Sequence, residues 1–443
     1  MVFELIALMV GLVILTRGAV SLFFLERSLV WYRKNYRNDN NIKGKLPRIV
    51  IIIPVLREQK RIIETLKYFL KSFGKYPIKI VVATTNREFE KKFNGLSTQR
   101  LVENYIQQNS LKEKISLINY PKKYGKKAHQ LNYVLEILND KTDYIAVYDA
   151  DSRPHKLTFD VFYQQMKLYP EAEVFQQSAL FVNNYNKISN FFLRASAILQ
   201  SRWTLAHEVA RLLRQSGKET IVSKLVNAHC VGHGLIISLK MLKIIGGFPE
   251  ETMNEDLIIG YLLRVKGVKI FPLPCLELAD APTTLLGLWN QKYVWFWGPL
   301  RYVEYYRFAC KKYNLDLRSR IKAMVLVFQG LISALAWLLS GPLFLVALIL
   351  VFFVDSVVTV VVLILAVVVY GPAQFVVTVD NFEEYQEWSG QKLKKQNLSE
   401  IIETALMSVP AILFNSIPPY FALFSEIRYR FQNTEIYKPK TDD

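Results

Sequence analysis

Two kinds of hydrophobic pattern divide the chain. Long and almost uninterrupted apolar runs cover residues 2–25, 321–376 and 401–424, and each run is long enough to cross the ~30 Å hydrocarbon layer of a membrane. Between about residues 46 and 317, shorter apolar runs alternate with polar, helix-like segments. These patterns predict a folded domain between an N-terminal transmembrane anchor and several C-terminal transmembrane helices.

The region between the long runs has the pattern of an α/β domain. Four short apolar runs have the composition of buried parallel strands: 48–54, 78–83, 115–118 and 143–148. Segments with helical character separate them. Strands and helices that alternate at this spacing predict an α/β sheet with right-handed crossovers. Ligands of such sheets bind beyond the carboxyl ends of the strands.

The charges beside the apolar runs predict a topology. Basic residues follow the first run, so the positive-inside rule makes it a signal anchor with a cytoplasmic domain behind it: Arg27, Arg33, Lys34, Arg37, Lys43, Lys45 and Arg48. A basic C-terminus with Arg428, Arg430, Lys438 and Lys440 favours three spans in 321–376 plus the final one. Two spans there would require a re-entrant last segment, and a buried amphipathic helix is the alternative for the first run.

We therefore expect a multi-pass protein of the cell membrane with its α/β domain in the cytoplasm. The expected divisions are an anchor at 1–25, the α/β domain at 46–284, an amphipathic interfacial segment at 285–316, transmembrane helices at 317–426 and a basic cytoplasmic tail at 427–443. The interfacial segment is rich in Trp and Tyr, which favour a membrane interface and also stack on sugars. Residues 191–213 have a similar character.

Composition and charge exclude several other classes. The chain has 443 residues, of which 51% are hydrophobic, and a disordered chain lacks such apolar content. Three scattered cysteines, Cys230, Cys275 and Cys310, do not make a disulfide scaffold. Much of the net charge of +18 flanks the apolar runs, where it would meet anionic membrane lipids, so nucleic acid is not an expected partner.

Two charged motifs lie where ligands of an α/β sheet bind. The fourth strand ends in Asp149-Ala150-Asp151, and residues two apart in a strand face the same side. Both carboxylates could therefore hold Mg²⁺ or Mn²⁺, which in turn binds substrate phosphates. Upstream, lysines that include Lys126 and Lys127 surround Gly125 at the start of a helix, which is typical of an anion site. A solvated turn and a solvated helix face are the alternatives.

Two further motifs admit both a chemical and a structural interpretation. Glu255-Asp256 opens a helix, where paired acids often act as caps, but Asp256 could also accept a proton from a hydroxyl. His229, Cys230 and His233 lack a fourth zinc ligand at a suitable spacing, so a zinc site is not expected. His233 is either a ligand-pocket residue or a hydrogen-bonded core histidine.

Six segments, taken in order, resemble the membrane-anchored members of glycosyltransferase family 2. This group holds cellulose, chitin and hyaluronan synthases and, as a close relative, ceramide glucosyltransferase. The segments are Ile51–Pro54 with Glu58, Lys127 to Asn132, Asp149 to Asp151, Gly232–Gly234 with Ile245–Phe248, Glu255-Asp256, and Gln291 with Trp295.

The resemblance implies a GT-A fold and the transfer, with inversion, of a sugar from a UDP or GDP sugar. It implies a divalent ion at Asp149 and Asp151, donor contacts from Pro54, Glu58, Lys127, Asp149, Gln291 and Trp295, and Asp256 as the catalytic base. Gly232, His233 and Glu255 are the residues expected on the acceptor side. The expected partners are a nucleotide sugar, a lipid or glycan acceptor and membrane lipids.

Three departures from the family pattern bear on the substrate. The second strand has no acid in residues 81–86, and Val294 stands where the family has Arg. Residues 375–380 faintly resemble the gating loop of cellulose synthase, with Asp380 in place of its Lys, and we interpret this resemblance as coincidence. The last two favour a single transfer to a lipid-linked or membrane-associated acceptor, and a processive polysaccharide synthase is the alternative. The intact acids disfavour a non-catalytic scaffold, and Asp355 alone is thin support for a transporter.

Overall fold

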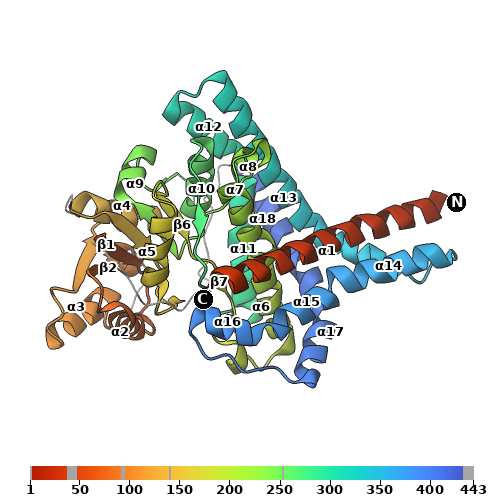
Figure 1. The fold of residues 1–443 in the computed structure, drawn as a ribbon, viewed down its shortest axis with the longest axis horizontal. Helices are drawn as coiled ribbons and strands as arrows, with labels where there is room; N and C mark the ends of the chain where they lie inside the picture. The colour runs from red at the N-terminus through yellow and green to blue at the C-terminus, as the bar shows by residue number, and fades with distance from the viewer. Residues whose placement is uncertain (1, 37–46, 91–94, 139–140, 252–253, 433–443) are drawn as a thin grey trace. The chain divides into compact units, whose positions relative to one another are not determined.

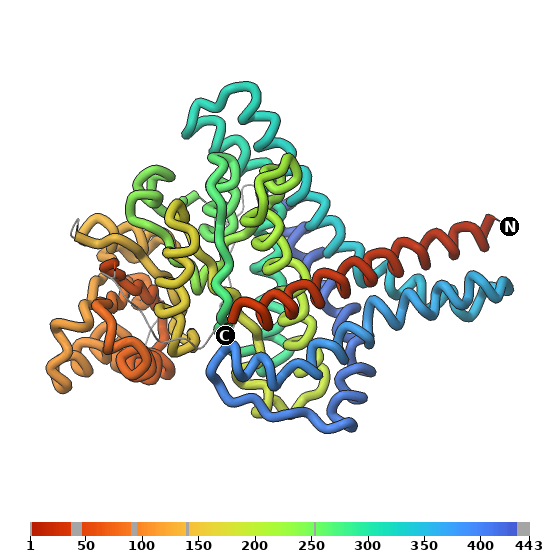
Figure 2. The backbone as a smooth tube through the Cα atoms, in the orientation of Figure 1, coloured from red at the N-terminus to blue at the C-terminus, as the bar shows by residue number. Residues whose placement is uncertain are grey.

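The structure, a computed structural model, describes residues 2–36, 47–90, 95–138, 141–251 and 254–432. The contacts divide the chain into a helical unit (residues 1–34, 180–211 and 279–443) and an α/β unit (residues 35–179 and 212–278). Figure 2 follows the backbone of both. Five of the basic residues that we used to predict the topology lie outside the described residues: Arg37, Lys43, Lys45, Lys438 and Lys440.

A mixed seven-stranded sheet forms the centre of the α/β unit, in the order β3-β2-β1-β4-β8-β6-β9. Strands β1, β2 and β6 of this sheet are labelled in Figure 1. The strands are β1 (Ile49–Pro54), β2 (Ile78–Thr85), β3 (Ile115–Tyr120), β4 (Tyr144–Val147), β6 (Val174–Gln176), β8 (Leu235–Ser238) and β9 (Phe271–Pro272). Strands β1 to β4 are parallel, whereas β8 is antiparallel to both β4 and β6. The four predicted strands are present, and the predicted α/β class is confirmed.

Helices cover both faces of this sheet, which explains its continuous apolar strands. In β1, Ile51 and Ile53 face a core that includes α2 (Ile62–Phe73), α3 (Thr98–Gln108) and α5 (Thr158–Leu168). Val50 and Ile52 face the opposite core, which is built on α4 (Lys127–Ile137), α9 (Leu239–Ile245) and α10 (Glu255–Val265). A strand that is buried on both faces needs apolar residues at every position.

Short elements complete the α/β unit. Strand β5 (Arg153–Pro154) pairs antiparallel with β10 (Glu277–Leu278). The remaining elements are the 3₁₀ turn η1 (Asn86–Glu90) and the helix α8 (Ile221–Leu225). Strand β7 (Ala179–Leu180) and helix α7 (Ala210–Ser216) lie where the chain passes between the units.

The helical unit consists of long apolar helices and shorter connecting ones. In chain order these are α1 (Val2–Asn35), η2 (Tyr185–Lys187), α6 (Phe191–Trp203), the π-helix η3 (Thr204–Val209), α11 (Leu285–Leu300), α12 (Tyr302–Tyr313), α13 (Leu317–Leu350), α14 (Val357–Tyr370), α15 (Pro372–Asp380), α16 (Phe382–Ser389), α17 (Leu398–Asn415) and α18 (Ile417–Gln432).

Four helical segments of the described chain are long and apolar enough to cross a membrane: Val2–Asn35, Leu317–Leu350, Val357–Asp380 and Leu398–Phe431. The expectation of three spans within residues 321–376 was therefore wrong, because this block holds two. Helix α13 continues through Gly341-Pro342, where the Gly341 amide donates to Ser416 Oγ at 2.8 Å. Neighbouring polar groups that satisfy the backbone allow a proline inside a membrane helix.

One segment of the predicted α/β domain belongs to the helical unit. Residues 180–211 lie inside the expected span of 46–284, but their contacts group them with the helices. Helix α6 packs against α17 and α15, which explains this grouping. The predicted division at 285–316 and the predicted sidedness of the membrane remain predictions.

Candidate active site

Lys127 joins three loops at the edge of the sheet where the parallel strands end. It is the first residue of α4, and its Nζ lies 2.6 Å from Asp149 Oδ1, which follows β4. The same ammonium donates to the Gly232 carbonyl at 2.6 Å and lies 3.9 Å from Glu255 Oε1 at the start of α10. Four predicted site residues from separate parts of the sequence therefore form one cluster.

The electrostatics of this cluster favour a charged lysine. Burial disfavours the ammonium form, but the carboxylates of Asp149, Glu255 and Asp256 outweigh this effect and raise the pKa of Lys127 above its ordinary value. One ammonium thus faces three carboxylates. The excess negative charge makes the site suited to bind a further cation.

The two aspartates of Asp149-Ala150-Asp151 lie in a turn rather than in the strand. Strand β4 ends at Val147, and residues 149–152 form a turn in which the Asp149 amide donates to Ser152 Oγ at 3.0 Å. The argument that both side chains face one side because they lie in a strand was therefore wrong. Asp151 Oδ2 instead pairs with Arg61 Nη1 at 3.6 Å, a partner that the sequence motifs did not indicate.

Protein side chains alone do not complete a metal site here. In the described part of the chain, no group of three or more His, Cys, Asp or Glu residues is placed to hold a metal ion. The side chains of Asp149 and Asp151 are 39% and 33% exposed and offer only oxygen atoms. Such a pair fits Mg²⁺ or Mn²⁺ whose remaining ligands are water and substrate phosphate.

Close backbone packing brings Asp256 to the same place. A Cβ atom added at Gly260 of α10 would lie 2.6 Å from the Cys230 amide nitrogen, so only glycine allows α10 to approach this loop. A Cβ atom at Gly232 would lie 3.2 Å from Lys127 Nζ and 3.3 Å from Asp256 Oδ2. The predicted base Asp256 therefore lies across Gly232 from Lys127.

The sheet topology explains why Gly232 reaches this cluster. Leu235 of β8 pairs with Val147 of β4 in antiparallel register. Because the two strands run in opposite directions, the residues before β8 lie beside the residues after β4. Gly232 and His233 are thus placed next to the turn that carries Asp149.

His233 is held by a buried acid. Its Nδ1 lies 3.2 Å from Glu277 Oε2, and Glu277 is fully buried. The His233 carbonyl accepts a hydrogen bond from the Gln176 side chain at 2.8 Å. These contacts agree with a hydrogen-bonded core histidine, and its acceptor role stays a prediction.

Glu58 lies in a separate polar network after β1, the strand that ends at Pro54. The Glu58 amide donates to Thr98 Oγ1 at 3.2 Å, and Thr98 in turn donates from its amide and its hydroxyl to Glu88. Glu88 is a buried acid three residues beyond β2, just after the window 81–86 in which the sequence shows none. It is a candidate for the acid that family members carry at this strand.

Of the loop lysines, Lys126 has a different role from Lys127. Lys126 Nζ donates to the Glu250 and Glu251 carbonyls at 3.1 and 3.0 Å. Further along α4, the Asn132 side chain donates to the Phe248 carbonyl and accepts from the Phe248 amide, both at 2.8 Å. Two of the family-like segments, at 127–132 and 245–248, are therefore joined by these bonds.

Gln291 and Trp295 belong to the helical unit. Both lie on α11, where Gln291 is buried and the Trp295 ring lies 4.9 Å from Lys292 Nζ. Lys292 is itself buried and donates to Gln200 Oε1 of α6. The donor or acceptor role of Gln291 and Trp295 remains a prediction.

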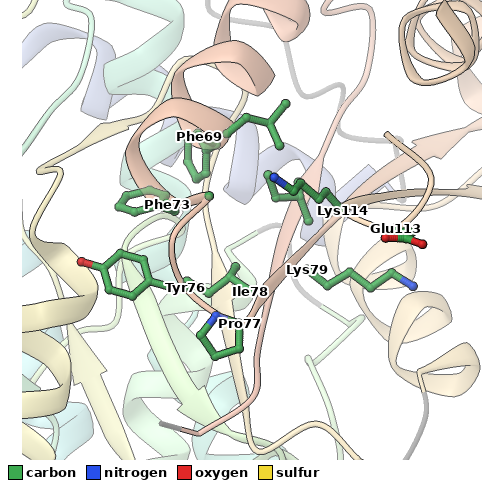
Figure 3. A pocket seen from close by; sticks show the side chains of 11 residues that line it. Phe69, Phe73, Tyr76, Pro77, Ile78, Lys79, Glu113 and Lys114 are labelled. Carbon is green, nitrogen blue, oxygen red and sulfur yellow. The ribbon is translucent and has the colours of Figure 1, made fainter. Parts of the chain in front are cut away.

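A cavity lies away from this charged cluster, in the same α/β unit. It has a volume of about 270 Å³ and is lined by Phe69 and Phe73 of α2 and by residues around the start of β2, such as Ile78 and Lys79 (Figure 3). Parallel strands begin at this edge of the sheet, whereas Asp149 follows the end of β4. None of the predicted site residues lines the cavity.

The sheet and the charged cluster at the carboxyl edge of its parallel strands define an α/β domain with a candidate binding site at that edge. Residues 144–373, about half of the chain, match the family described as Glycosyl transferase family group 2, and the chain belongs to this family. The predicted family is thus confirmed, and with it the predicted enzyme class of glycosyltransferases.

Two curated relatives are similar over part of their length. A "Probable glycosyltransferase" of Sulfolobus acidocaldarius is 22% identical over 284 residues, or 62% of this chain and 55% of the relative. A "Beta-monoglucosyldiacylglycerol synthase" of Synechocystis sp. is 32% identical over 96 residues, or 20% of each chain. The chain therefore spans about half, or less, of the length of these relatives.

Solved structures show a distant likeness. The mannosyltransferase PcManGT from Pyrobaculum calidifontis, in complex with GDP-Man and Mn²⁺, has a TM-score of 0.48 at 14% identity, covering 91% of this chain and 99% of that one. Residues 1–349 of S. aureus TarS have a TM-score of 0.38 at 12% identity, covering 88% of this chain and 93% of that one.

Proposed function

We propose that the protein is an inverting membrane glycosyltransferase that moves a sugar from a UDP or GDP sugar to a lipid-linked or membrane-associated acceptor. The observation that carries the proposal is the cluster of Lys127, Asp149, Gly232, Glu255 and Asp256, because it combines a phosphate-binding cation, carboxylates and a candidate base. Family membership supports the reaction class.

The donor diphosphate binds at Lys127 in this proposal. A departing nucleoside diphosphate gains negative charge, which a nearby ammonium stabilises. Lys127 is preorganised for this task, because Asp149 and the Gly232 carbonyl hold its Nζ in place. Pro54 and Glu58, at and after the end of β1, are the proposed contacts to the nucleotide.

Asp149 and Asp151 would hold Mg²⁺ or Mn²⁺ together with the donor phosphates. When bound, the ion supplies a Lewis acid that stabilises the leaving diphosphate. Arg61, which pairs with Asp151, restrains the orientation of that carboxylate. The excess of negative charge in the cluster supports the presence of a cation.

Asp256 is the proposed base, which takes the proton from the acceptor hydroxyl as the hydroxyl attacks the sugar. Its Oδ1 accepts the Leu257 amide at 2.9 Å, which fixes the side chain while Oδ2 stays directed towards Gly232. A single displacement with one base inverts the configuration of the sugar carbon, in parallel with single-displacement glycoside hydrolysis.

The membrane helices and one relative support a lipid-associated acceptor. Within the described ranges, four segments are suited to span a membrane, and one relative carries the name of a glycolipid-forming synthase. Membrane lipids would then surround the helical unit, and the α/β unit would face the cytoplasm.

The test is Asp256→Asn in the full-length protein, assayed for diphosphate release from a panel of nucleotide sugars with a membrane lipid extract present. We expect transfer to fall by about 100-fold or more, as when a general base is lost, while nucleotide binding stays nearly unchanged. Asp280→Asn, an acid that pairs with Asn183, is the matched control. Full transfer by Asp256→Asn contradicts the proposal.

The same assay separates the two acceptor classes. A single-sugar lipid product agrees with the proposal, whereas a ladder of long glycans from the purified protein and labelled donor contradicts single transfer and supports a processive synthase.

A further inference from the structure

Two arginines of the helical unit lie beside the same tyrosine. The guanidinium carbons of Arg17 on α1 and Arg202 on α6 are 5.5 and 5.8 Å from the centroid of the Tyr370 ring. Arg17 donates to the Ala336 carbonyl at 3.0 Å, and Arg202 donates to Gln374 Oε1 at 2.6 Å. These hydrogen-bond partners are uncharged.

Arg202 is the more deeply buried of the two arginines. Only 6% of it is exposed, and among the described residues its Nε has no hydrogen-bond partner. A guanidinium that is buried without an anion is strongly unfavourable, because it loses hydration without gaining a charged partner. An anion bound at this position would satisfy it.

Further positive charge surrounds the pair. Burial, together with the charges of Arg211, Arg202 and Arg17, lowers the pKa of His207 well below its ordinary value. All three arginines are therefore close enough to His207 to disfavour its protonated form. Arg211 donates to Ser333 Oγ at 2.9 Å. The cluster also contains an acid, Glu208, which is buried and has an interaction of its own.

The cluster is reachable and lies at an irregular backbone segment. Arg17 and Arg211 are each partly exposed. His207 lies in the π-helix η3, a geometry that is frequent at functional sites. Ser28 of α1 donates to the Leu205 carbonyl of the same segment at 2.7 Å, which ties α1 to it.

The depth of the cluster in a membrane can be read from two neighbouring helices. Helices α1 and α14 lie side by side in Figure 1, and Glu4 Oε1 accepts the amides of Asp355 and Ser356 at 3.2 Å. The charged residues Glu4 and Asp355 would lie at one membrane interface. Arg17 lies ~20 Å further along α1 at 1.5 Å per residue, and the hydrocarbon layer is ~30 Å thick. Arg17 would then lie ~10 Å from the opposite interface, and a long arginine side chain can extend in that direction.

We propose that Arg17, Arg202 and Arg211 form a binding site for the phosphate group of a membrane lipid. The guanidinium fork matches phosphate oxygens, and lipid phosphates lie at this interface. Exposed apolar residues beside the cluster, such as Val13, Val20 and Ile332, would contact the lipid chains. The site lies within the helical unit and does not depend on the proposed transfer reaction.

The test measures binding to the full-length protein in neutral detergent, with no sugar donor added. The probes are dioctanoyl phosphatidic acid, dioctanoylglycerol, which has the same chains without phosphate, and inorganic phosphate. We expect phosphatidic acid to bind and raise the unfolding midpoint, and dioctanoylglycerol to have no such effect. Arg17→Gln should weaken binding by about 10-fold or more, as the loss of one charge-assisted hydrogen bond predicts.

Control variants separate binding from folding. Arg27→Gln removes an exposed arginine of the same helix and should bind like the unmodified protein. Arg202→Lys keeps the charge in case Arg202→Gln does not fold, and should bind more weakly than the unmodified protein because the planar fork is lost. Competition by inorganic phosphate alone supports the phosphate site with a free anion as its ligand. Equal binding of dioctanoylglycerol, or unchanged binding by Arg17→Gln and Arg202→Lys, overturns the proposal.

Discussion

Lys127 and Asp149 form an ion pair of 2.6 Å across the carboxyl edge of the sheet, between the start of α4 and the turn after β4. Because Lys127 also contacts the Gly232 carbonyl and Glu255, this pair is the centre of the candidate site.

Replacing Lys127 by methionine should weaken donor binding by about 10- to 100-fold, because a charge-assisted contact to phosphate contributes ~1.5–3 kcal/mol. Calorimetric titration with the donor nucleotide measures this effect. Lys126→Met is the matched control, since Lys126 is the neighbouring lysine and its Nζ donates to the Glu250 and Glu251 carbonyls. Equal weakening by both variants would show that the loss is not specific to the cluster.

Replacing Asp151 by asparagine should reduce donor affinity when Mn²⁺ or Mg²⁺ is present and change it little when a chelator is present. The reason is that a carboxylate holds a divalent ion more strongly than an amide does. Asp143→Asn, at the opposite end of β4 beside Arg48, is the control. Donor affinity that does not depend on the metal in the unmodified protein would remove the basis of this prediction.

Gly232→Ala should reduce the rate of transfer by about 10- to 100-fold, with a stability loss of ~1 kcal/mol or less. The added methyl group would lie 3.2 Å from Lys127 Nζ and 3.3 Å from Asp256 Oδ2, so both groups must shift by a few tenths of an ångström. Steady-state kinetics and thermal unfolding measure the two effects. Gly217→Ala, whose methyl group would approach only the Leu213 carbonyl, should leave the rate unchanged.

The stability of the helical unit should depend on pH through Lys292. Burial lowers the pKa of Lys292 to about 7, from 10.5 when it is exposed. Between these two values the unfolded state binds more protons than the folded state, so stability rises with pH, by ~2 kcal/mol from pH 7 to pH 9.

Lys292→Met should remove this rise, and thermal unfolding of both proteins in detergent at pH 7 and pH 9 measures it. Lys312→Met, near the end of α12, is the control. A rise with pH that is the same in Lys292→Met and in the unmodified protein would assign the effect to other groups.

Two expectations failed for related reasons. The argument that Asp149 and Asp151 share one face assumed a strand, but β4 ends two residues earlier and a turn follows. The expectation of three spans in 321–376 failed because α13 continues through Gly341-Pro342, where Ser416 Oγ accepts the Gly341 amide. In both cases a contact or an element boundary that local sequence does not encode decided the outcome.

The sequence by itself determined those elements whose environment is the same at every position along them. Strand β1 is apolar at successive positions because both faces of the sheet are covered, and the four candidate spans are long because the membrane has a fixed thickness. The order of motifs also indicated the family.

Only the tertiary structure decided which of these residues meet. The antiparallel pairing of β8 with β4 places Gly232 beside Asp149, and the close approach at Gly260 brings Asp256 to the same point. In the helical unit, Tyr370 lies beside both Arg17 and Arg202, which are far apart in the chain. Such meetings depend on strand direction and helix packing, which arise from contacts distant in sequence and leave no local pattern.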